Sequence, residues 1–189
     1  MHSHSLILAS ASPRRRELLA QLGRPFTVVV PGLDEQPWPR EKPASYALRN
    51  AAEKARAVAE RHPAATILAA DTIVVMEDHI LEKPADAAHA IDMLRRLSGR
   101  AHEVITGVCV WTPRDGGFRE QADAVRTAVR FRALDETEIA AYVATGEPMD
   151  KAGAYAIQGG AGGFVESVDG PYDNVVGLPL KTVRRLLAV

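Results

Sequence analysis

Three consecutive arginines stand at the start of a segment that carries the signals of a helix. Ser12 is a good N-cap, and Pro13 suits the first helical position because its missing N–H is not needed there. Arg14, Arg15 and Arg16 therefore fall in the first turn, at the positive end of the helix dipole, where cations are unfavourable. A bound anion removes this conflict, since free N–H groups and guanidinium groups favour phosphate. Two interpretations fit: a site for a phosphorylated ligand, and a cluster of solvated arginines.

One carboxylate stands inside an apolar stretch of the chain. Asp71 follows residues 67–70 and precedes 73–76, and both flanks are apolar. A carboxylate is rarely buried without a partner, and the ends of strands in α/β proteins are where sites form. Asp71 is therefore a candidate general base or metal ligand. The alternative is a capped turn or a structural ion pair.

Four further segments could carry chemistry, and each also has a plainer interpretation. The pair Asp34-Glu35 lies in a proline-rich loop, where carboxylates could bind a divalent ion together with phosphate oxygens, or simply face water. Lys54 lies beside the apolar stripe of an expected helix, and Lys83 precedes a proline at a bend; either is consistent with a lysine whose amine reaches solvent. Gln158 follows a run of small residues and has an amide that can bind a base edge, although a tight turn explains the same run.

The length, composition and net charge of the chain exclude several classes of protein. Its 189 residues, 47% hydrophobic and 25% charged, are typical of one globular domain or two small lobes. A net charge of −1 argues against a broad basic surface for nucleic acid. The single cysteine, Cys109, excludes an internal disulfide and a Cys-based zinc cluster, and its apolar surroundings predict a buried thiol. No run is long enough to span a membrane and no secretory segment is evident, so we expect a cytoplasmic protein.

Periodicity and turn residues predict alternating strands and helices. Strands are expected at 6–9, 26–30, 67–70 with 73–76, 80–82, 103–112, 125–132, 164–165 and 175–176. Helices are expected to begin after Ser12, at Ser45, at Asp86, after Asp135 and at Leu178. The alternation favours an α/β sheet with a mixed or antiparallel portion. A Walker A loop, a Rossmann fingerprint and an identifiable Ser-His-Asp set are absent.

An ordered set of short motifs is more specific than any one of them. They are Ala9-Ser-Ala-Ser-Pro-Arg-Arg, Glu53-Lys-Ala, Ala70-Asp-Thr, Glu82-Lys-Pro, His102-Glu-Val-Ile-Thr-Gly107, Asp150-Lys-Ala-Gly-Ala-Tyr155, Ile157-Gln-Gly and Asn174-Val-Val-Gly-Leu-Pro-Leu180. Over essentially the whole chain, this set resembles the Maf family of nucleoside triphosphate pyrophosphatases. The resemblance implies a single domain over residues 1–189 with no separable linker. It also implies an elongated mixed sheet flanked by helices, with two lobes around a central cleft, as in inosine triphosphate pyrophosphatases.

The resemblance further implies hydrolysis of a nucleoside triphosphate to the monophosphate and pyrophosphate, with a divalent cation, Mg²⁺ or Mn²⁺. Asp150, Tyr155 and Gln158 match the branch that prefers dTTP and UTP, and modified pyrimidine triphosphates form a further substrate class. The branch that acts on 7-methyl-GTP tends to have Cys-Ala-Gly-Ser-Phe and Glu at those places. Ala156 stands where the first branch commonly has Gly, and we expect only a local adjustment there. A non-catalytic nucleotide-sensing protein that regulates cell division is the alternative.

Roles are carried over only where this sequence matches the family's motifs. Asp71 matches the catalytic general base. The specificity positions are Arg14, Thr72 and Gln158. The phosphate-binding positions are Ser12, Arg15, Lys54 and Lys83. The metal-binding positions are Glu35 and Asp71. A homodimer is expected by analogy with the family and from the frequency of homo-oligomers, whereas neither nucleic acid nor a membrane is expected as a partner.

Overall fold

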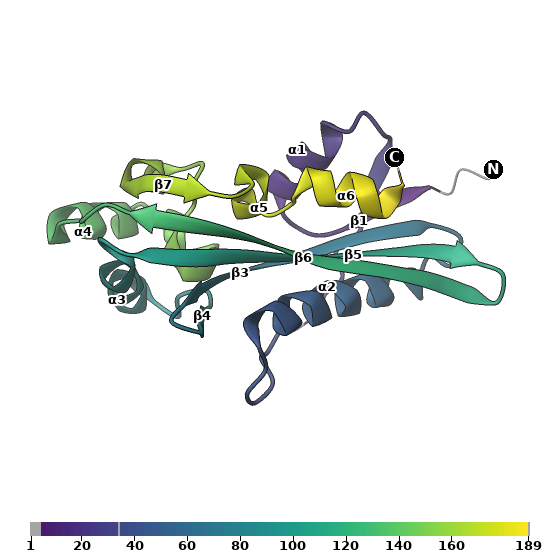
Figure 1. Ribbon diagram of the computed structural model, residues 1–189, viewed down its shortest axis with the longest axis horizontal. Helices are drawn as coiled ribbons and strands as arrows, with labels where there is room; N and C mark the ends of the chain where they lie inside the picture. The colour runs from purple at the N-terminus through teal and green to yellow at the C-terminus, as the bar shows by residue number, and fades with distance from the viewer. Residues whose placement is uncertain (1–4, 34, 189) are drawn as a thin grey trace. The chain divides into compact units, whose positions relative to one another are not determined.

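The structure is a computed structural model that describes residues 5–33 and 35–188. Within these residues, seven strands form one mixed sheet in the order β2-β1-β3-β5-β6-β7, with β4 paired to β3 (Figure 1). The strands are β1 (Leu6–Ala9), β2 (Phe26–Val28), β3 (Thr66–Met76), β4 (His79–Leu81), β5 (Ala101–Arg114), β6 (Gly117–Phe131) and β7 (Val165–Asp169). The expected α/β fold with a mixed sheet is confirmed.

Helices connect most of these strands. The α-helices are α1 (Pro13–Ala20), α2 (Pro43–Ala59), α3 (Ala87–Leu97), α4 (Glu136–Ala144), α5 (Tyr172–Val176) and α6 (Leu180–Leu187). Three short 3₁₀ helices follow α4: η1 (Glu147–Asp150), η2 (Ala152–Ala154) and η3 (Gly160–Phe164). Local caps set several starting points as the sequence predicts. The Asp86 carboxylate accepts from the His89 N–H at 2.8 Å, and Asp135 and Glu138 form a full capping box.

Strand direction follows the burial of each strand. β1 is buried along its whole length and pairs in parallel with both neighbours, Leu6 opposite Phe26 on β2 and opposite Thr66 on β3. A continuous apolar run is typical of a parallel strand that is covered on both faces. β6 pairs with β7 in the antiparallel direction, and its end alternates between buried and exposed residues, which is typical of a strand with one face in water.

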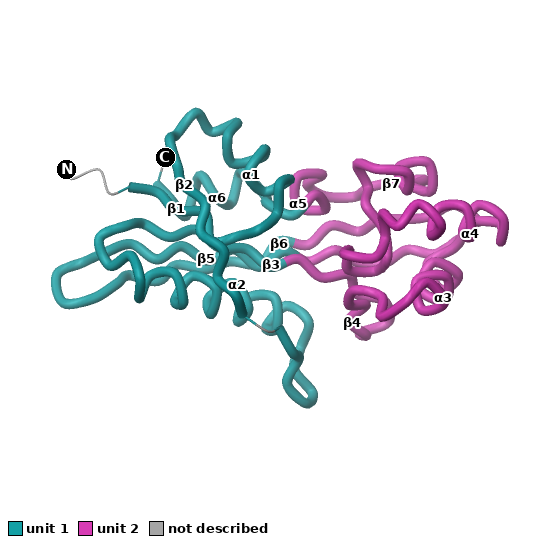
Figure 2. The backbone as a smooth tube through the Cα atoms, turned by 180° about the vertical axis from the view of Figure 1, so that it is seen from behind, with its two compact units in different colours: residues 1–71, 106–125, 177–189 teal, residues 72–105, 126–176 magenta. Residues whose placement is uncertain are grey.

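The chain divides into two compact units, shown in different colours in Figure 2. Unit 1 comprises residues 1–71, 106–125 and 177–189, and unit 2 comprises residues 72–105 and 126–176. The strands β3, β5 and β6 each contribute residues to both units. Within unit 1, α2 lies on one face of the sheet, and α1 and α6 lie on the other, in both views (Figures 1 and 2).

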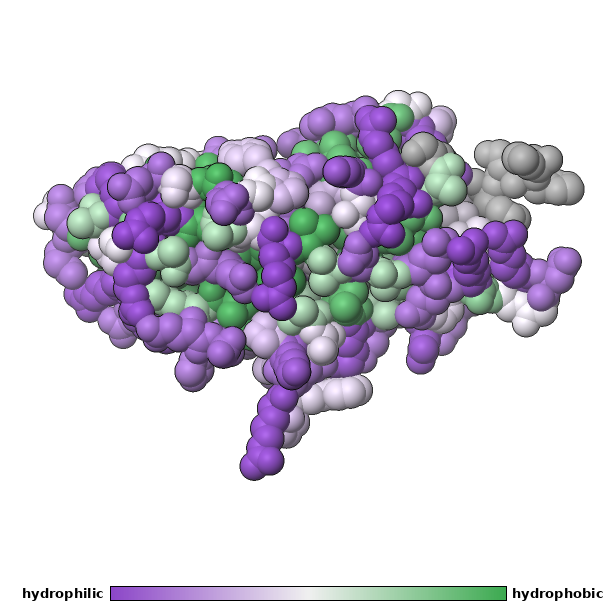
Figure 3. Space-filling model, in the orientation of Figure 1, coloured by the Kyte–Doolittle hydropathy of each residue, from purple (hydrophilic) through white to green (hydrophobic). Residues whose placement is uncertain are grey.

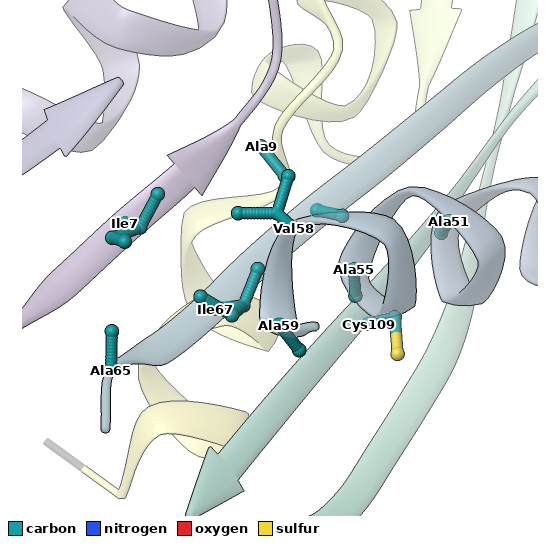
Figure 4. Packing of buried hydrophobic residues seen from close by; sticks show 10 residues of the cluster. Ile7, Ala9, Ala51, Ala55, Val58, Ala59, Ala65, Ile67 and Cys109 are labelled. Atoms are coloured by element: carbon teal, nitrogen blue, oxygen red, sulfur yellow. The ribbon is translucent and has the colours of Figure 1, made fainter. Parts of the chain in front are cut away.

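The core of unit 1 is built from small side chains on α2. Ala51, Ala55, Val58 and Ala59 pack against Ile7, Ala9, Ala65, Ile67 and Cys109 on and beside β1, β3 and β5 (Figure 4). The helix approaches β5 so closely that a Cβ at Gly107 would lie 2.4 Å from the carbonyl oxygen of Ala47. Cys109 is fully buried, as the sequence predicts, and burial raises the pKa of its thiol to about 12. This close packing fixes the polar residues of α2 against β3.

Unit 2 has an aromatic core. Phe131 makes edge-on contacts with His102, Tyr155 and Phe164, at centroid distances of 5.1, 4.9 and 6.0 Å. The His102 Nε2 and the Tyr155 hydroxyl lie 2.8 Å apart in a hydrogen bond. Burial lowers the pKa of His102 to about 4, so the imidazole is neutral at physiological pH.

The structure corrects three expectations. α2 begins at Pro43 with Lys42 as N-cap, not at Ser45, because the proline takes the first helical position. β3 runs without a break from Thr66 to Met76, so Asp71 lies inside the strand and not at a strand end. Residues 175–176 belong to the short helix α5, although two adjacent valines favour a strand. Asn174, in that helix, donates to the carbonyl of Val104 at 3.0 Å, a tertiary contact that residue-type preference does not reveal.

The surface is mostly polar on the face that Figure 3 shows, where hydrophobic residues appear in small groups. The large hydrophobic side chains that are exposed include Val28, Val30, Leu33 and Trp38, on β2 and the loop that follows it. Across residues 5–33 and 35–188, every helix is too short or too polar to cross a membrane.

Candidate functional site

The first turn of α1 directs one arginine inward. The Ser12 side chain caps the helix and accepts from the Arg15 N–H at 3.4 Å, as the sequence predicts. The Arg15 Nε donates to the carbonyl of Gly177 at 2.9 Å, and Nη1 donates to the Ser10 Oγ at 3.4 Å. Arg16 is exposed, so the three arginines do not act as one cluster.

Two carboxylates compensate the charge of Arg15. Burial lowers the pKa of Arg15, while the negative charges of Asp71 and Glu35 raise it and Arg14 opposes them. The net effect is a pKa below its ordinary value. An arginine guanidinium nevertheless stays charged in proteins. A half-buried cation beside two carboxylates is a structured charge site and not a set of arginines splayed into water.

Asp71 is held by two residues of α2. Lys54 Nζ donates to Asp71 Oδ1 at 2.7 Å, and Asn50 Nδ2 donates to Asp71 Oδ2 at 3.1 Å. Asn50 and Lys54 are one helical turn apart, so both side chains point from the same face of α2. All three residues are buried, with Asn50 only 1% exposed. The carboxylate thus has a fixed orientation.

Glu35 completes this charge cluster. Its Oε2 lies 2.8 Å from Lys54 Nζ, so the lysine bridges Glu35 and Asp71. Glu35 side chain is 37% exposed, whereas that of Asp71 is 7% exposed. The neighbouring Asp34 lies outside the described residues. Glu35, for which the sequence by itself favours a plain surface loop, therefore contacts the buried pair.

The two carboxyl groups differ in acidity. Burial raises the pKa of Asp71, but the charges of Lys54 and Arg15 and hydrogen bonds from Lys54 and Glu35 outweigh burial and lower it. Burial also raises the pKa of Glu35, and the charge of Asp71 adds to this effect, so that its pKa stays above the ordinary value despite Lys54. Asp71 is consequently ionised at neutral pH and can accept a proton.

The donor set fits a divalent cation that is shared with a ligand. In the part of the chain that the structure describes, His, Cys, Asp and Glu form no group of three or more that could hold a metal on their own. Mg²⁺ is usually bound by one or two carboxylates together with water and substrate phosphates, and Glu35 and Asp71 meet that description. Asn50 Oδ1 is buried and, among the described residues, has no hydrogen-bond partner, which leaves one more oxygen acceptor beside Asp71.

Three of the candidate residues belong to unit 2. Thr72 directly follows Asp71 on β3 and is partly buried. Lys83 and Gln158 are exposed. Their surroundings are linked, because the N–H of Gly153 donates to the carbonyl of Glu82, next to Lys83, at 3.1 Å. The contacts and charges described above thus join Ser12, Arg14, Arg15, Glu35, Lys54 and Asp71 in unit 1.

Comparison with known proteins matches the sequence of this chain to one family. The family model described as "Maf-like protein" matches residues 5–189. The chain belongs to the Maf family. Three curated Maf relatives carry the name "dTTP/UTP pyrophosphatase". The protein from Symbiobacterium thermophilum is 53% identical over 96% of this chain and 92% of its own length; that from Escherichia coli O157:H7 is 51% identical over 97% and 92%. That from Anaeromyxobacter sp. strain Fw109-5 is 55% identical over 96% and 87%. Among solved structures, the Staphylococcus aureus Ham1 protein aligns with a TM-score of 0.47 and 16% identity over 67% of this chain and 71% of that chain, a similarity too weak to support any inference.

Two residues near the site of this Maf chain were not predicted from the sequence. Asn50 is one, and its spacing of four from Lys54 on a buried helix face was the available signal. Arg49 is the other: it donates to both carboxylate oxygens of Glu41 at 2.8 and 2.7 Å and to the carbonyl of Gln36 at 3.0 Å. Its guanidinium also lies 4.1 Å from the centre of the Trp38 ring. Arg49 therefore anchors residues 36–41, which follow Glu35 in the loop, to α2.

Proposed function

We propose that this chain hydrolyses dTTP and UTP to the nucleoside monophosphate and pyrophosphate. The observation that carries the proposal is the buried, fixed and ionised carboxylate of Asp71, held by Lys54 and Asn50 beside Arg15 and Glu35. A chain about half identical to proteins named dTTP/UTP pyrophosphatase supports the substrates. The enzyme is a hydrolase of phosphoanhydride bonds.

The reaction needs a base for one proton and positive charge for the leaving group. The oxygen of a water molecule forms a bond to the α-phosphorus, the bond from that phosphorus to the bridging oxygen breaks, and pyrophosphate departs with the electron pair. Asp71 takes the proton from the water. Arg15 and Lys54 stabilise the negative charge that develops on the pyrophosphate. Electrostatic interactions with fixed cations are stronger in a site that partly excludes water than in bulk water.

A divalent cation, Mg²⁺ or Mn²⁺, would be held by Glu35 and Asp71. When bound, it supplies a Lewis acid for the phosphate oxygens and makes water a better proton donor. That chemistry matters here because the lowered pKa of Asp71 makes this carboxylate a weak base by itself. The amide oxygen of Asn50, which has no hydrogen-bond partner among the described residues, is a further hydrogen-bond acceptor beside Asp71.

The other residues take the roles that the family resemblance implies. Ser12 and Lys83 bind phosphate oxygens, and Arg14, Thr72 and Gln158 select the nucleotide. The amide of Gln158 can complement the edge of uracil or thymine, which has two carbonyl groups beside one N–H.

The proposal extends to the whole chain. Residues 1–189 act as one domain, which is supported by a family model that spans both units and by three strands that contribute to both. The enzyme works in the cytoplasm, as a homodimer and without nucleic acid as a partner.

Pyrophosphate release tests the proposal. The parent chain and Asp71→Asn are compared on dTTP, UTP, CTP, dATP, GTP, 7-methyl-GTP and modified pyrimidine triphosphates, each with and without Mg²⁺ or Mn²⁺. Asp92→Asn is the matched control, because Asp92 is an exposed aspartate that pairs with Arg95. We expect metal-dependent release from dTTP and UTP, kept in the control and reduced by orders of magnitude in Asp71→Asn. A folded parent that binds nucleotide without releasing pyrophosphate would instead indicate the nucleotide-sensing alternative.

A further inference from the structure

The exposed residue Gln158 sits on backbone that is held from both sides. Residues 153–157 before it are buried, and residues 158–160 are exposed. An exposed side chain can select a base only when the backbone that carries it has a fixed position. Two side chains of unit 2 fix that backbone here, and the sequence analysis assigned neither of them a role.

Tyr142 and Glu147 bind the backbone on the two sides of Gln158. The Tyr142 hydroxyl accepts from the Ala156 N–H at 3.1 Å and donates to Glu147 Oε1 at 2.8 Å. The two carboxylate oxygens of Glu147 lie 3.1 and 3.2 Å from the donating N–H of Gly160. These hydrogen bonds tie the second residue before Gln158 to the second residue after it. We call Tyr142 and Glu147 the loop clamp.

The loop clamp has a rigid support. Tyr142 is only 5% exposed, and its ring packs edge-on against Phe164 at 5.3 Å. Thr145 Oγ donates to the Tyr142 carbonyl at 2.6 Å and accepts from the Glu147 N–H at 3.2 Å. The end of α4 and the start of η1 therefore present both side chains of the clamp in a fixed geometry.

The loop itself is shaped to receive the carboxylate. A Cβ at Gly159 would lie 2.1 Å from Glu147 Oε1, so only glycine leaves room for the carboxylate at this place. An added Cβ at Gly160 would lie 3.1 Å from the Tyr142 ring, which is a tight contact but not a clash. A carboxylate that accepts from a backbone N–H makes a stronger bond than a neutral group would. These contacts give the backbone around Gln158 one well-defined position.

We propose that Tyr142 and Glu147 are positioning residues for nucleobase selection, which they achieve by holding the segment 156–160 that carries Gln158. This inference rests on the proposed function and on the role of Gln158 in it. The hydrogen bonds of the loop clamp run to the segment 156–160 within unit 2, so we expect its loss to change selection more than the chemical step.

Steady-state kinetics on UTP, dTTP, CTP and GTP test the loop clamp, with folding of each variant checked by thermal melting. Glu147→Ala is expected to lower the preference for UTP and dTTP over GTP about tenfold, mainly through KM. Glu147→Gln keeps an oxygen that can accept from both Tyr142 and Gly160, and is expected to retain the parent's preference within about twofold. Tyr142→Phe is the second variant, should Glu147→Ala fail to fold.

A matched control and a double variant make the test specific. Glu136→Ala removes an exposed glutamate that pairs with Arg95 and lies on α4, the helix that carries Tyr142, and is expected to leave both selectivity and turnover unchanged. In a Gln158→Ala background, Glu147→Ala is expected to cause no further change in preference, because both act through one side chain.

Two results would overturn the inference alone: folded Glu147→Ala and Tyr142→Phe variants with the parent's preference, or an undiminished Glu147→Ala effect in the Gln158→Ala background. A parent chain that releases no pyrophosphate from UTP or dTTP overturns the proposed function, and this inference with it. The two failures are therefore distinct.

Discussion

Replacing Lys54 with methionine should destabilise the fold as well as abolish turnover. Lys54 bridges Asp71 at 2.7 Å and Glu35 at 2.8 Å, and the side chains of Lys54 and Asp71 are only 8% and 7% exposed. Methionine keeps most of the aliphatic chain but removes the charge. Two carboxylates then face each other in a partly dry site without their shared cation.

The structure sets the size of the effect. At 2.7 Å, the Coulomb attraction between Lys54 and Asp71 is about 6 kcal/mol for an effective dielectric constant of about 20. Desolvation of both groups offsets part of this, and removing one partner of a buried pair typically costs about 3–5 kcal/mol. Glu35 adds about 1 kcal/mol or less, because its side chain is 37% exposed and its pairing is screened by solvent. We therefore expect Lys54→Met to lower the free energy of unfolding by about 3–5 kcal/mol.

Urea denaturation at neutral pH measures the loss, with Lys181→Met on the exposed side of α6 as the matched control, expected within about 0.5 kcal/mol of the parent. The double variant Lys54→Met/Asp71→Asn should recover about 2 kcal/mol or more relative to Lys54→Met, since the unpaired buried charge is gone. If Lys54→Met were as stable as the control, or if Asp71→Asn gave no recovery, the pair would not be a buried ion pair of this strength.

Three further predictions concern packing, pH and the loop that carries Glu35. Gly107→Ala should lower the free energy of unfolding by about 3 kcal/mol, because the new methyl group would meet the backbone of Ala47; a variant as stable as the parent in urea would contradict this close approach. The free energy of unfolding should fall by up to about 3 kcal/mol as the pH drops from 6.5 to 4, because His102 is protonated in the unfolded chain but stays neutral in the native protein. If the stability of His102→Gln fell equally steeply over this pH range, His102 would not be the cause. Arg49→Ala should lower the free energy of unfolding measured in urea by about 2 kcal/mol, because Glu41 loses its partner. It should also raise the metal concentration that half-activates the enzyme, because the loop that carries Glu35 loses its anchor. An unchanged metal concentration for half-activation would show that this loop does not contribute to metal binding.

Local signals predicted the helix starts of this chain more reliably than its charge site. Ser12 and Asp135 each accept a hydrogen bond from a backbone N–H only three residues later, so a short sequence pattern contains both partners of the capping interaction. Ser45 failed as a cap because Pro43 offered an earlier start. The apolar flanks of Asp71 indicated burial correctly, but they could not show that β3 continues through it, since an ionised residue inside a strand needs partners that only the packing of α2 supplies.

The residues that the sequence did not reveal act through contacts between distant positions. In the sequence, Glu147 is typical of a surface glutamate after a glycine. Its neighbours in the sequence do not predict that it accepts a hydrogen bond from a backbone N–H thirteen positions later. Lys54 and Asp71 lie seventeen residues apart, yet the ordered set of family motifs includes both of them. The loop clamp has no such motif: a tyrosine and a glutamate are common, and their function arises from the turn at Thr145 that aims both at one segment. Sequence reasoning therefore finds residues with a proposed role at the substrate more readily than residues that hold other residues in place.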